Sequence, residues 1–183
     1  MPRPRPALHR EPSLTEARGK SAMTWDLPSP FIHERVAVHA EIDGYGHVNN
    51  AVYLVWIDDC SWAHSISTGI SPELCRDLNR GMAVWRTQIN YLLPALEGDE
   101  IQVATWPVFN NRRLRIDRRF QVRRKSDNAT LLRALIHYVC IDLASGKASR
   151  MPEVFKGYRV APEVAAAIAG EREPFLPGVE PRG

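Results

Sequence analysis

Apolar and polar residues alternate along four successive stretches in the second half of the chain, and this alternation narrows the choice of folds more than any other feature. The stretches cover residues 82–93, 99–109, 112–125 and 129–143. Alternation with a period of two predicts β-strands that bury one face. The junctions between them are short, carry turn-forming residues and leave no room for a crossover helix. The sequence therefore predicts a four-stranded meander whose neighbouring strands pair as antiparallel hairpins.

Helical periodicity marks the stretch before these strands. Over residues 50–67, apolar residues recur at the spacing of one helix face. Asn49 suits the N-cap of this helix, and Gly69 suits its C-terminal stop. We expect the helix to pack on the sheet through four bulky residues: Val52, Val55, Trp56 and Trp62.

A strand over residues 31–42 and a short helix over residues 72–79 complete the expected elements. One strand, one long helix and four further strands are typical of an α+β protein. The sequence therefore predicts an α+β fold in which the long helix packs on a curved antiparallel β-sheet.

The distribution of proline indicates where the folded domain begins and ends. Six prolines fall in residues 1–30 and four in residues 161–183, out of 14 in the whole chain. We expect a disordered N-terminal arm over 1–30, one folded domain over 31–160, and a C-terminal tail over 161–183 with a short helix around 162–169. Met23, near the end of the arm, offers an alternative start.

Composition excludes several classes of function. The chain has 183 residues, of which 25% are charged, and a formal net charge of +3, which is typical of one globular domain and does not imply nucleic-acid binding. No apolar stretch approaches the roughly 20 residues of a membrane-spanning helix. The N-terminus has no signal-like apolar region, so we expect a cytoplasmic protein. The cysteines and histidines lack metal-ligand spacing, so we expect no metal site.

The segment from Asp43 to Tyr53, DGYGHVNNAVY, carries the residues best suited to chemistry. Asp43 ends a predicted strand, two glycines let a ligand approach the backbone, and a helix N-terminus follows. The carboxylate can act as a nucleophile or a general base, and the free N–H groups of the first helical turn can hold an oxyanion. The same residues also suit an ordinary turn and helix cap, so spacing alone leaves both interpretations open.

A longer pattern in this region resembles the hotdog-fold acyl thioesterases. It reads D-x-x-G-H-V-N-N-x-x-Y-x-x-W-x-x-D from Asp43 to Asp59. The pattern is similar to bacterial acyl-CoA thioesterases related to 4-hydroxybenzoyl-CoA thioesterase, and its HVNN core is also similar to plant acyl-ACP thioesterases. Residues 89–103 and 139–153 resemble later parts of the same family, so the likeness spans residues 32–155.

The resemblance implies a single hotdog domain that hydrolyses acyl-CoA, or alternatively acyl-ACP, to a carboxylic acid and a thiol. Asp43 matches the family's catalytic carboxylate, and Asn50 matches the position whose backbone N–H helps to form the oxyanion hole. His47 would polarise the catalytic groups. Three further residues of the motif would contact the substrate: Gly46, Asn49 and Tyr53. The resemblance implies no cofactor other than coenzyme A as part of the substrate.

Some members of the family place the catalytic acid inside the long helix instead. Asp58 and Asp59 keep this alternative open, although Asp59 is better interpreted as a supporting partner. The family members also differ in whether the acid attacks the thioester directly or activates water, and the sequence leaves both routes open.

The stretch 112–125 concentrates positive charge, with eight basic residues and a single acid, Asp117. Arg118 falls in phase with the apolar face of this strand, where another apolar residue is expected. We interpret the cluster, Arg118 included, as a binding site for the phosphates of coenzyme A or for the acidic surface of acyl carrier protein. Alternatively, the charges protect an exposed strand and Arg118 pairs with an acid at a subunit interface.

A single sheet covered by one helix leaves an open edge, so we expect at least a homodimer, or a homotetramer, with the site between subunits. Two other functions remain open. One is an acyl-thioester hydratase or dehydratase, in which His47 and Asp43 move a proton. The other is a non-catalytic acyl-CoA-binding module.

Overall fold

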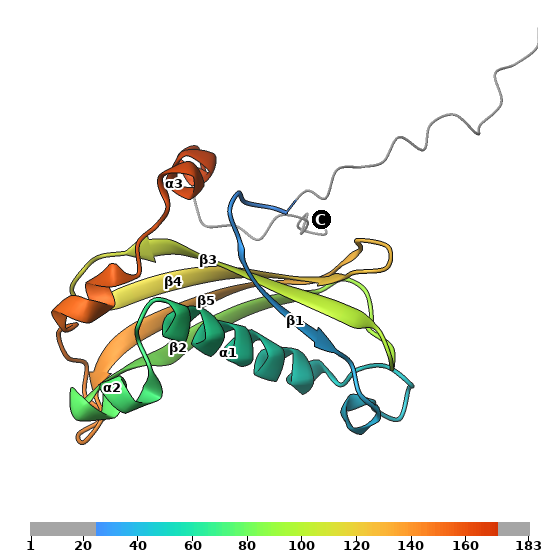
Figure 1. Cartoon of the computed structure of the whole chain (residues 1–183), viewed down its shortest axis with the longest axis horizontal. Coiled ribbons are helices and arrows are strands. Elements are labelled where there is room, and N and C mark those ends of the chain that lie inside the picture. Colours follow the sequence, from blue (N-terminus) through green and yellow to red (C-terminus); the bar gives the residue numbers. More distant parts are fainter. Residues whose placement is uncertain (1–24, 172–183) are drawn as a thin grey trace, which may run out of the picture.

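The computed structural model describes residues 25–171, and these form one antiparallel sheet with helices on both faces (Figure 1). The sheet order is β1-β3-β4-β5-β2. The strands are β1 (Phe31–Val36), β2 (Arg80–Tyr91), β3 (Glu100–Asn110), β4 (Arg115–Arg124) and β5 (Thr130–Asp142). The α-helices are α1 (Asn50–Ser67), α2 (Pro72–Asp77) and α3 (Pro162–Ile168), and two 3₁₀ turns are η1 (His39–Glu41) and η2 (Glu153–Gly157). The predicted α+β hotdog fold is confirmed.

Helix α1 lies along the concave face of the sheet and covers the main core (Figure 1). Trp56, as expected, is fully buried, and Tyr53, Ile57 and Cys60 pack beside it. Two of the residues expected to pack between α1 and the sheet are not buried there. Val55 and Trp62 are 55% and 38% exposed, because the helix turns a second apolar stripe away from its own sheet.

The strand connection differs from the predicted meander. Strand β2 pairs with β5 instead of β3, so it forms the sheet edge opposite β1. The connection over residues 92–99 spans three strand spacings, about 14 Å, which is well within the reach of about 26 Å for eight extended residues. Its middle residue, Ala95, is fully buried. Ala95 joins the connection to the N-terminal end of α1, because its N–H donates to the Tyr53 hydroxyl and its carbonyl accepts the Val48 N–H.

Strand β1 is shorter than predicted and ends at Val36. The next residues form η1, in which a side-chain oxygen of Glu41 accepts a hydrogen bond from the backbone N–H of Val38 at 3.0 Å. Glu41 also accepts hydrogen bonds from Arg35 and from the indole N–H of Trp56, at 2.5 and 3.0 Å. These contacts stop the strand and join it to α1.

The outer face of the sheet is covered by the two ends of the described chain. Leu27, near the start of the described chain, and Val164 of α3 are both buried against Trp106 of β3. The Trp106 indole N–H donates to the Pro28 carbonyl at 2.8 Å. Residues 25–30 therefore belong to the fold, not to a disordered arm, and the fold continues past residue 160. The rest of the predicted arm and of the tail lies outside the described residues.

Candidate functional site

The loop that precedes α1 holds the Asp43 carboxylate in a fixed position. The backbone N–H of Asp43 donates to the His47 carbonyl at 2.8 Å, and that of Gly46 donates to the Asp43 carbonyl at 3.0 Å. Gly46 has a positive φ of 80°, which glycine adopts without strain. One carboxylate oxygen, Oδ1, accepts the N–H of Tyr45 at 2.8 Å and the N–H of His47 at 3.4 Å. Within residues 25–171 the other oxygen, Oδ2, has no hydrogen-bond partner.

The first turn of α1 leaves one backbone donor free beside this loop. The Asn49 side chain caps the helix by accepting the N–H of Ala51 at 2.9 Å, and the Asn49 carbonyl accepts the N–H of Val52 at 2.9 Å. The N–H of Asn50 makes no hydrogen bond with any residue the structure describes. An N–H at the positive end of a helix dipole is suited to binding developing negative charge.

A buried pair of hydrogen bonds supports the loop from below. The N–H of Val48 donates to the Ala95 carbonyl at 2.9 Å, and the N–H of Ala95 donates to the Tyr53 hydroxyl oxygen at 2.8 Å. Burial raises the pKa of Tyr53, so the hydroxyl stays neutral. Tyr53 therefore lies in the core and positions the loop, and does not itself reach the site where substrate contact was expected.

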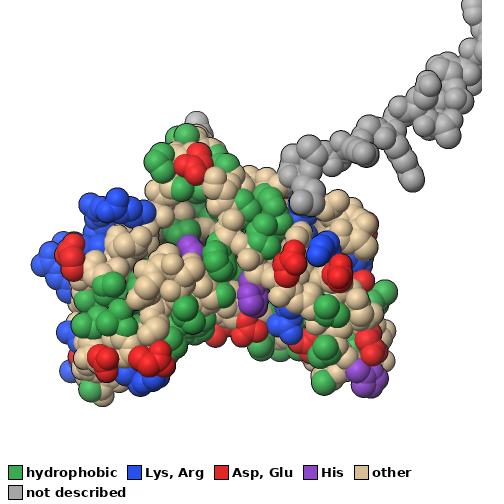
Figure 2. Space-filling model, viewed as in Figure 1, with side chains coloured by type: hydrophobic (Ala, Val, Ile, Leu, Met, Phe, Trp, Pro, Cys, Tyr) green, Lys and Arg blue, Asp and Glu red, His purple; other side chains and the backbone are tan. Residues whose placement is uncertain are grey.

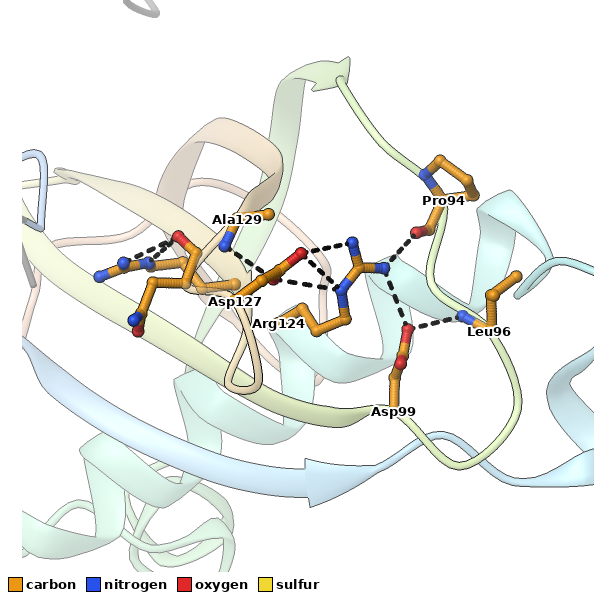
Figure 3. Close-up of polar contacts among 8 residues, drawn as sticks. Pro94, Leu96, Asp99, Arg124, Asp127 and Ala129 are labelled. Atoms are coloured by element: carbon orange, nitrogen blue, oxygen red, sulfur yellow. Dashed lines mark hydrogen bonds and ion pairs between the residues drawn. The ribbon is translucent and has the colours of Figure 1, made fainter. Parts of the chain in front are cut away.

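The connection that carries Ala95 is held in turn by Arg124, at the end of β4 (Figure 3). The guanidinium donates to the Pro94 carbonyl and to Asp99 Oδ2, both at 3.3 Å, and Asp99 Oδ2 also accepts the N–H of Leu96 at 2.9 Å. On its other side Arg124 pairs with Asp127 at 2.9 Å and holds the pKa of that carboxyl below its usual range. In the sequence Arg124 belongs to the basic stretch 112–125 that we interpret as a phosphate-binding cluster. No spacing along the chain links Arg124 to Asp99.

The remaining motif residues gather around Asp43. Gly46, His47, Asn49 and Asn50 all lie in the exposed surface of the loop and the helix start. The His47 side chain makes no hydrogen bond within residues 25–171, and its link to Asp43 runs only through its backbone. The loop is therefore open to solvent on the side away from Ala95.

Arg118 lies in a different place, beneath the C-terminal half of α1. Its Nη1 donates to the Ser61 carbonyl at 3.2 Å and its Nη2 to Ser65 Oγ at 3.4 Å. Eleven residues of helix separate Asn50 from Ser61, which corresponds to about 16 Å along the axis. The structure thus does not bring Arg118 together with Asp43 of the same chain. No carboxylate in residues 25–171 forms an ion pair with Arg118.

Most of the other basic residues of β4 have acidic or backbone partners. Arg119 pairs with Glu171, and Arg123 donates to the Asn128 carbonyl at 2.8 Å. Lys125, the residue after β4, lies 3.5 Å from Glu34. The unpaired remainder of the cluster lies at the end of the sheet opposite the Asp43 loop, where Figure 2 shows blue side chains gathered. There a groove is lined by five basic residues and one acid, Glu153, which pairs with Lys156. The basic residues are Arg112, Arg113, Arg150, Lys156 and Arg159.

The two acids inside α1 have distinct environments. Asp59 pairs with Arg35 at 3.2 Å, and its supporting role in the site stays a prediction. Asp58 has no ion-pair partner within the described chain and lines the same pocket as Arg118. Partial burial and the neighbouring Asp59 raise the pKa of Asp58.

Two further observations limit the kinds of site present. Among the described residues, no group of three or more His, Cys, Asp or Glu side chains is placed to hold a metal ion. None of the helices in residues 25–171 is long and apolar enough to cross a bilayer.

One antiparallel sheet wrapped around a long helix is the hotdog fold. In this chain the Asp43 carboxylate lies in the loop just before the N-terminus of that helix. The family model of the thioesterase-like superfamily matches residues 37–159. The chain belongs to the thioesterase-like superfamily. A search of curated proteins gives no significant match.

Solved structures share this fold at low sequence identity. The 1,4-dihydroxy-2-naphthoyl-CoA thioesterase Slr0204 from Synechocystis is 21% identical with a TM-score of 0.64, over 80% of this chain and 100% of that one. The hypothetical protein SAV2348 from Staphylococcus aureus, in complex with CoA, is 17% identical with a TM-score of 0.67, over 82% and 90% of the chains. The probable thioesterase YbaW from Escherichia coli is 24% identical with a TM-score of 0.59, over 69% and 95%.

Proposed function

We propose that this protein hydrolyses acyl-CoA thioesters to a carboxylic acid and free coenzyme A. The observation that carries the proposal is the pairing of the Asp43 carboxylate, held by backbone N–H groups through Oδ1 alone, with the free N–H of Asn50 at the start of α1. Membership of the thioesterase-like superfamily supports the same reaction.

The free Oδ2 of Asp43 has two routes to hydrolysis. It either attacks the thioester carbonyl, and water then cleaves the resulting anhydride, or it takes a proton from the water that attacks. In both routes the carbonyl oxygen gains negative charge, which the Asn50 N–H stabilises by a hydrogen bond. The thiolate of coenzyme A leaves and is protonated. His47 borders the site without contacting the carboxylate through its side chain, so hydrolysis is favoured over a His-dependent hydration.

A second copy of the chain completes this open site. Strand β2 is a long edge strand, and Val84 and Trp85 on it are 52% and 48% exposed. The exposed stripe of α1, which includes Val55 and Trp62, adds apolar surface. Edge strands of this kind pair with another strand unless they are protected. We therefore propose a homodimer in which β2 pairs with β2 of the partner in antiparallel register.

This pairing suggests how coenzyme A is held. The Tyr91 end of β2 lies at the Asp43 loop, where the Tyr91 hydroxyl donates to the Asn50 carbonyl at 2.9 Å. Antiparallel pairing places the opposite end, at Arg80, beside the partner's loop. The basic groove that contains Arg112 and Arg113 lies at that same end. We propose that it binds the phosphates of coenzyme A, or the acidic surface of acyl carrier protein, for the site of the neighbouring subunit.

Release of free thiol from a panel of short, medium, long and aromatic acyl-CoAs tests the function. Asp43→Asn keeps the size of the side chain and removes the charge, so we expect the rate to fall by about 10²–10⁴-fold. Asp59→Asn is the matched control, because this acid pairs with Arg35 and should leave most of the turnover. Unchanged hydrolysis by folded Asp43→Asn, or its loss in Asp59→Asn alone, would refute the assignment of Asp43.

A further inference from the structure

Three arginines of β4 are buried, and two of them, Arg118 and Arg123, form no ion pair with a carboxylate among the described residues. Of these two, Arg118 is the one that lines a pocket with apolar walls. Arg119 pairs with Glu171, and Arg123 donates twice to the Asn128 carbonyl while its guanidinium stacks on Trp25 at 4.8 Å. Arg118 is only 4% exposed, and no carboxylate within residues 25–171 lies at ion-pair distance from it. Burial of an unpaired charge costs several kcal/mol. The structure therefore holds a cation with unused binding capacity.

The contacts of Arg118 leave part of its guanidinium free to bind a ligand. Its protein acceptors are the Ser61 carbonyl and Ser65 Oγ, at 3.2 and 3.4 Å, and both are neutral. The guanidinium lies 4.8 Å from the centre of the Tyr158 ring and 6.0 Å from that of Tyr138. A guanidinium carries five N–H donors in a planar fork that matches a carboxylate. Two neutral acceptors do not use this capacity.

Arg118 faces a pocket with mostly apolar walls. The apolar lining comes from the connection between α1 and α2, the strands and η2, and includes Ile70, Met82, Ile116 and Phe155. Trp62 of α1 and Val84 of β2 also line the pocket. Its mouth therefore lies between these two elements, at the edge of the dimer interface proposed above. Asp58 lines it from the exposed side of α1 without pairing with Arg118. The pocket thus combines one buried cation, Arg118, and one exposed acid, Asp58, with apolar surface.

Phosphates are less suited to this site than carboxylates. The exposed basic groove around Arg112 offers several cations in water, as a multiply charged phosphate group requires. The pocket offers a single cation, and burial raises the pKa of Tyr138 and Tyr158, so both hydroxyls are neutral. One positive charge in an apolar enclosure is matched by one negative charge on an apolar body.

We propose that the pocket between α1, α2 and the sheet binds the carboxylate of an organic acid through Arg118, with the apolar part of that acid against Ile116 and Phe155. The acid has two sources. It is either a free carboxylic acid or the far end of an acyl group whose thioester lies at a catalytic loop. The binding of free acids does not depend on the hydrolysis proposed above. Binding of an acyl group through its far carboxylate does rest on the proposed hydrolysis.

Calorimetric titration of the full-length protein with benzoate and hexanoate, beside benzamide and hexanamide, tests the proposal. The acids should bind at least tenfold more tightly than the neutral amides of the same shape. Arg118→Gln should remove this preference. Arg123→Gln, which alters a buried arginine on the other face of the same strand, should keep it. Equal binding of acid and amide, binding of neither acid, or an intact preference in Arg118→Gln would overturn the proposal.

The comparison of acids with amides on the native protein decides the question even if Arg118→Gln does not fold. A second arm distinguishes the two sources. Hydrolysis of an acyl-CoA that ends in a carboxylate is compared with that of a methyl-ended acyl-CoA of equal length. A KM that is at least tenfold lower for the first, lost in Arg118→Gln, assigns the acid to the substrate. Binding of free acids without this difference in KM assigns the pocket to a separate ligand. If no thioester is hydrolysed at all, the proposed function fails while the binding result still stands.

Discussion

Tyr53→Phe isolates a single buried hydrogen bond that supports the candidate site. The Tyr53 hydroxyl oxygen accepts the N–H of Ala95 at 2.8 Å, and Ala95 is fully buried. Phenylalanine keeps the ring that packs between Trp56 and Tyr91, so no cavity forms. The substitution leaves a buried amide without a partner, which costs about 1–3 kcal/mol in the free energy of unfolding.

The same substitution should also reduce catalysis. The Ala95 carbonyl accepts the N–H of Val48 at 2.9 Å, so any shift of Ala95 to find a new hydrogen-bond partner moves the loop between Asp43 and Asn50. We expect kcat for thioester hydrolysis to fall, because the reacting groups lose their alignment. Urea unfolding followed by tryptophan fluorescence measures the first effect, and thiol release measures the second.

Tyr91→Phe provides the matched control. This tyrosine is 44% exposed, and its hydroxyl donates to the Asn50 carbonyl, which water can satisfy instead. We expect a cost of no more than about 0.5 kcal/mol. If Tyr53→Phe is no more destabilising than Tyr91→Phe, the inferred role of the buried Ala95 contact is wrong.

Three further predictions concern Arg124 beside the candidate site, His64 on α1 and the edge strand β2. Arg124→Gln should lower the free energy of unfolding by about 1–2 kcal/mol and reduce kcat, whereas Lys125→Gln, at an exposed ion pair, should change neither in the same urea and thiol assays. Burial and the nearby positive charge of Arg118 lower the pKa of His64 to about 4 from 6.5, so the unfolded chain binds a proton that the folded chain excludes. Stability should therefore fall from pH 6.5 to pH 4, and in urea titrations across that range His64→Phe should reduce the fall by about 1–3 kcal/mol. Val84→Lys on β2 should give a monomer by light scattering, whereas Val36→Lys at the exposed end of β1 should leave a dimer. If both variants are dimers, the subunits do not pair through β2.

The elements with strong local signals were predictable from the sequence. Residues 50–67 form α1 with the bounds expected from their periodicity and with Asn49 as the N-cap, because helix period and capping are local properties. The four later strands lie within a few residues of their predicted bounds for the same reason.

The pairing of the strands and the environment of single charges depend on contacts between distant residues. Strand β2 pairs with β5, about fifty residues along the chain, and alternation along β2 does not reveal this partner. The basic residues of β4 look alike in sequence but have different environments. Arg124 supports the connection that carries Ala95, Arg119 pairs with Glu171, and Arg118 is buried without an acidic partner in the described chain. The order of the residues in the motif predicted where Asp43, His47 and Asn50 gather, whereas their catalytic roles stay predictions.

The cover on the outer face of the sheet affects how the protein folds during synthesis. Trp106 of β3 is made early, but the α3 residue that buries it, Val164, is made almost sixty residues later. A nascent chain that has released all five strands from the ribosome still presents an apolar sheet face to solvent. Such surfaces bind chaperones or other nascent chains. Folding of this domain is therefore completed only when the segment after residue 160 has emerged, and translation pauses before that point would prolong the aggregation-prone stage.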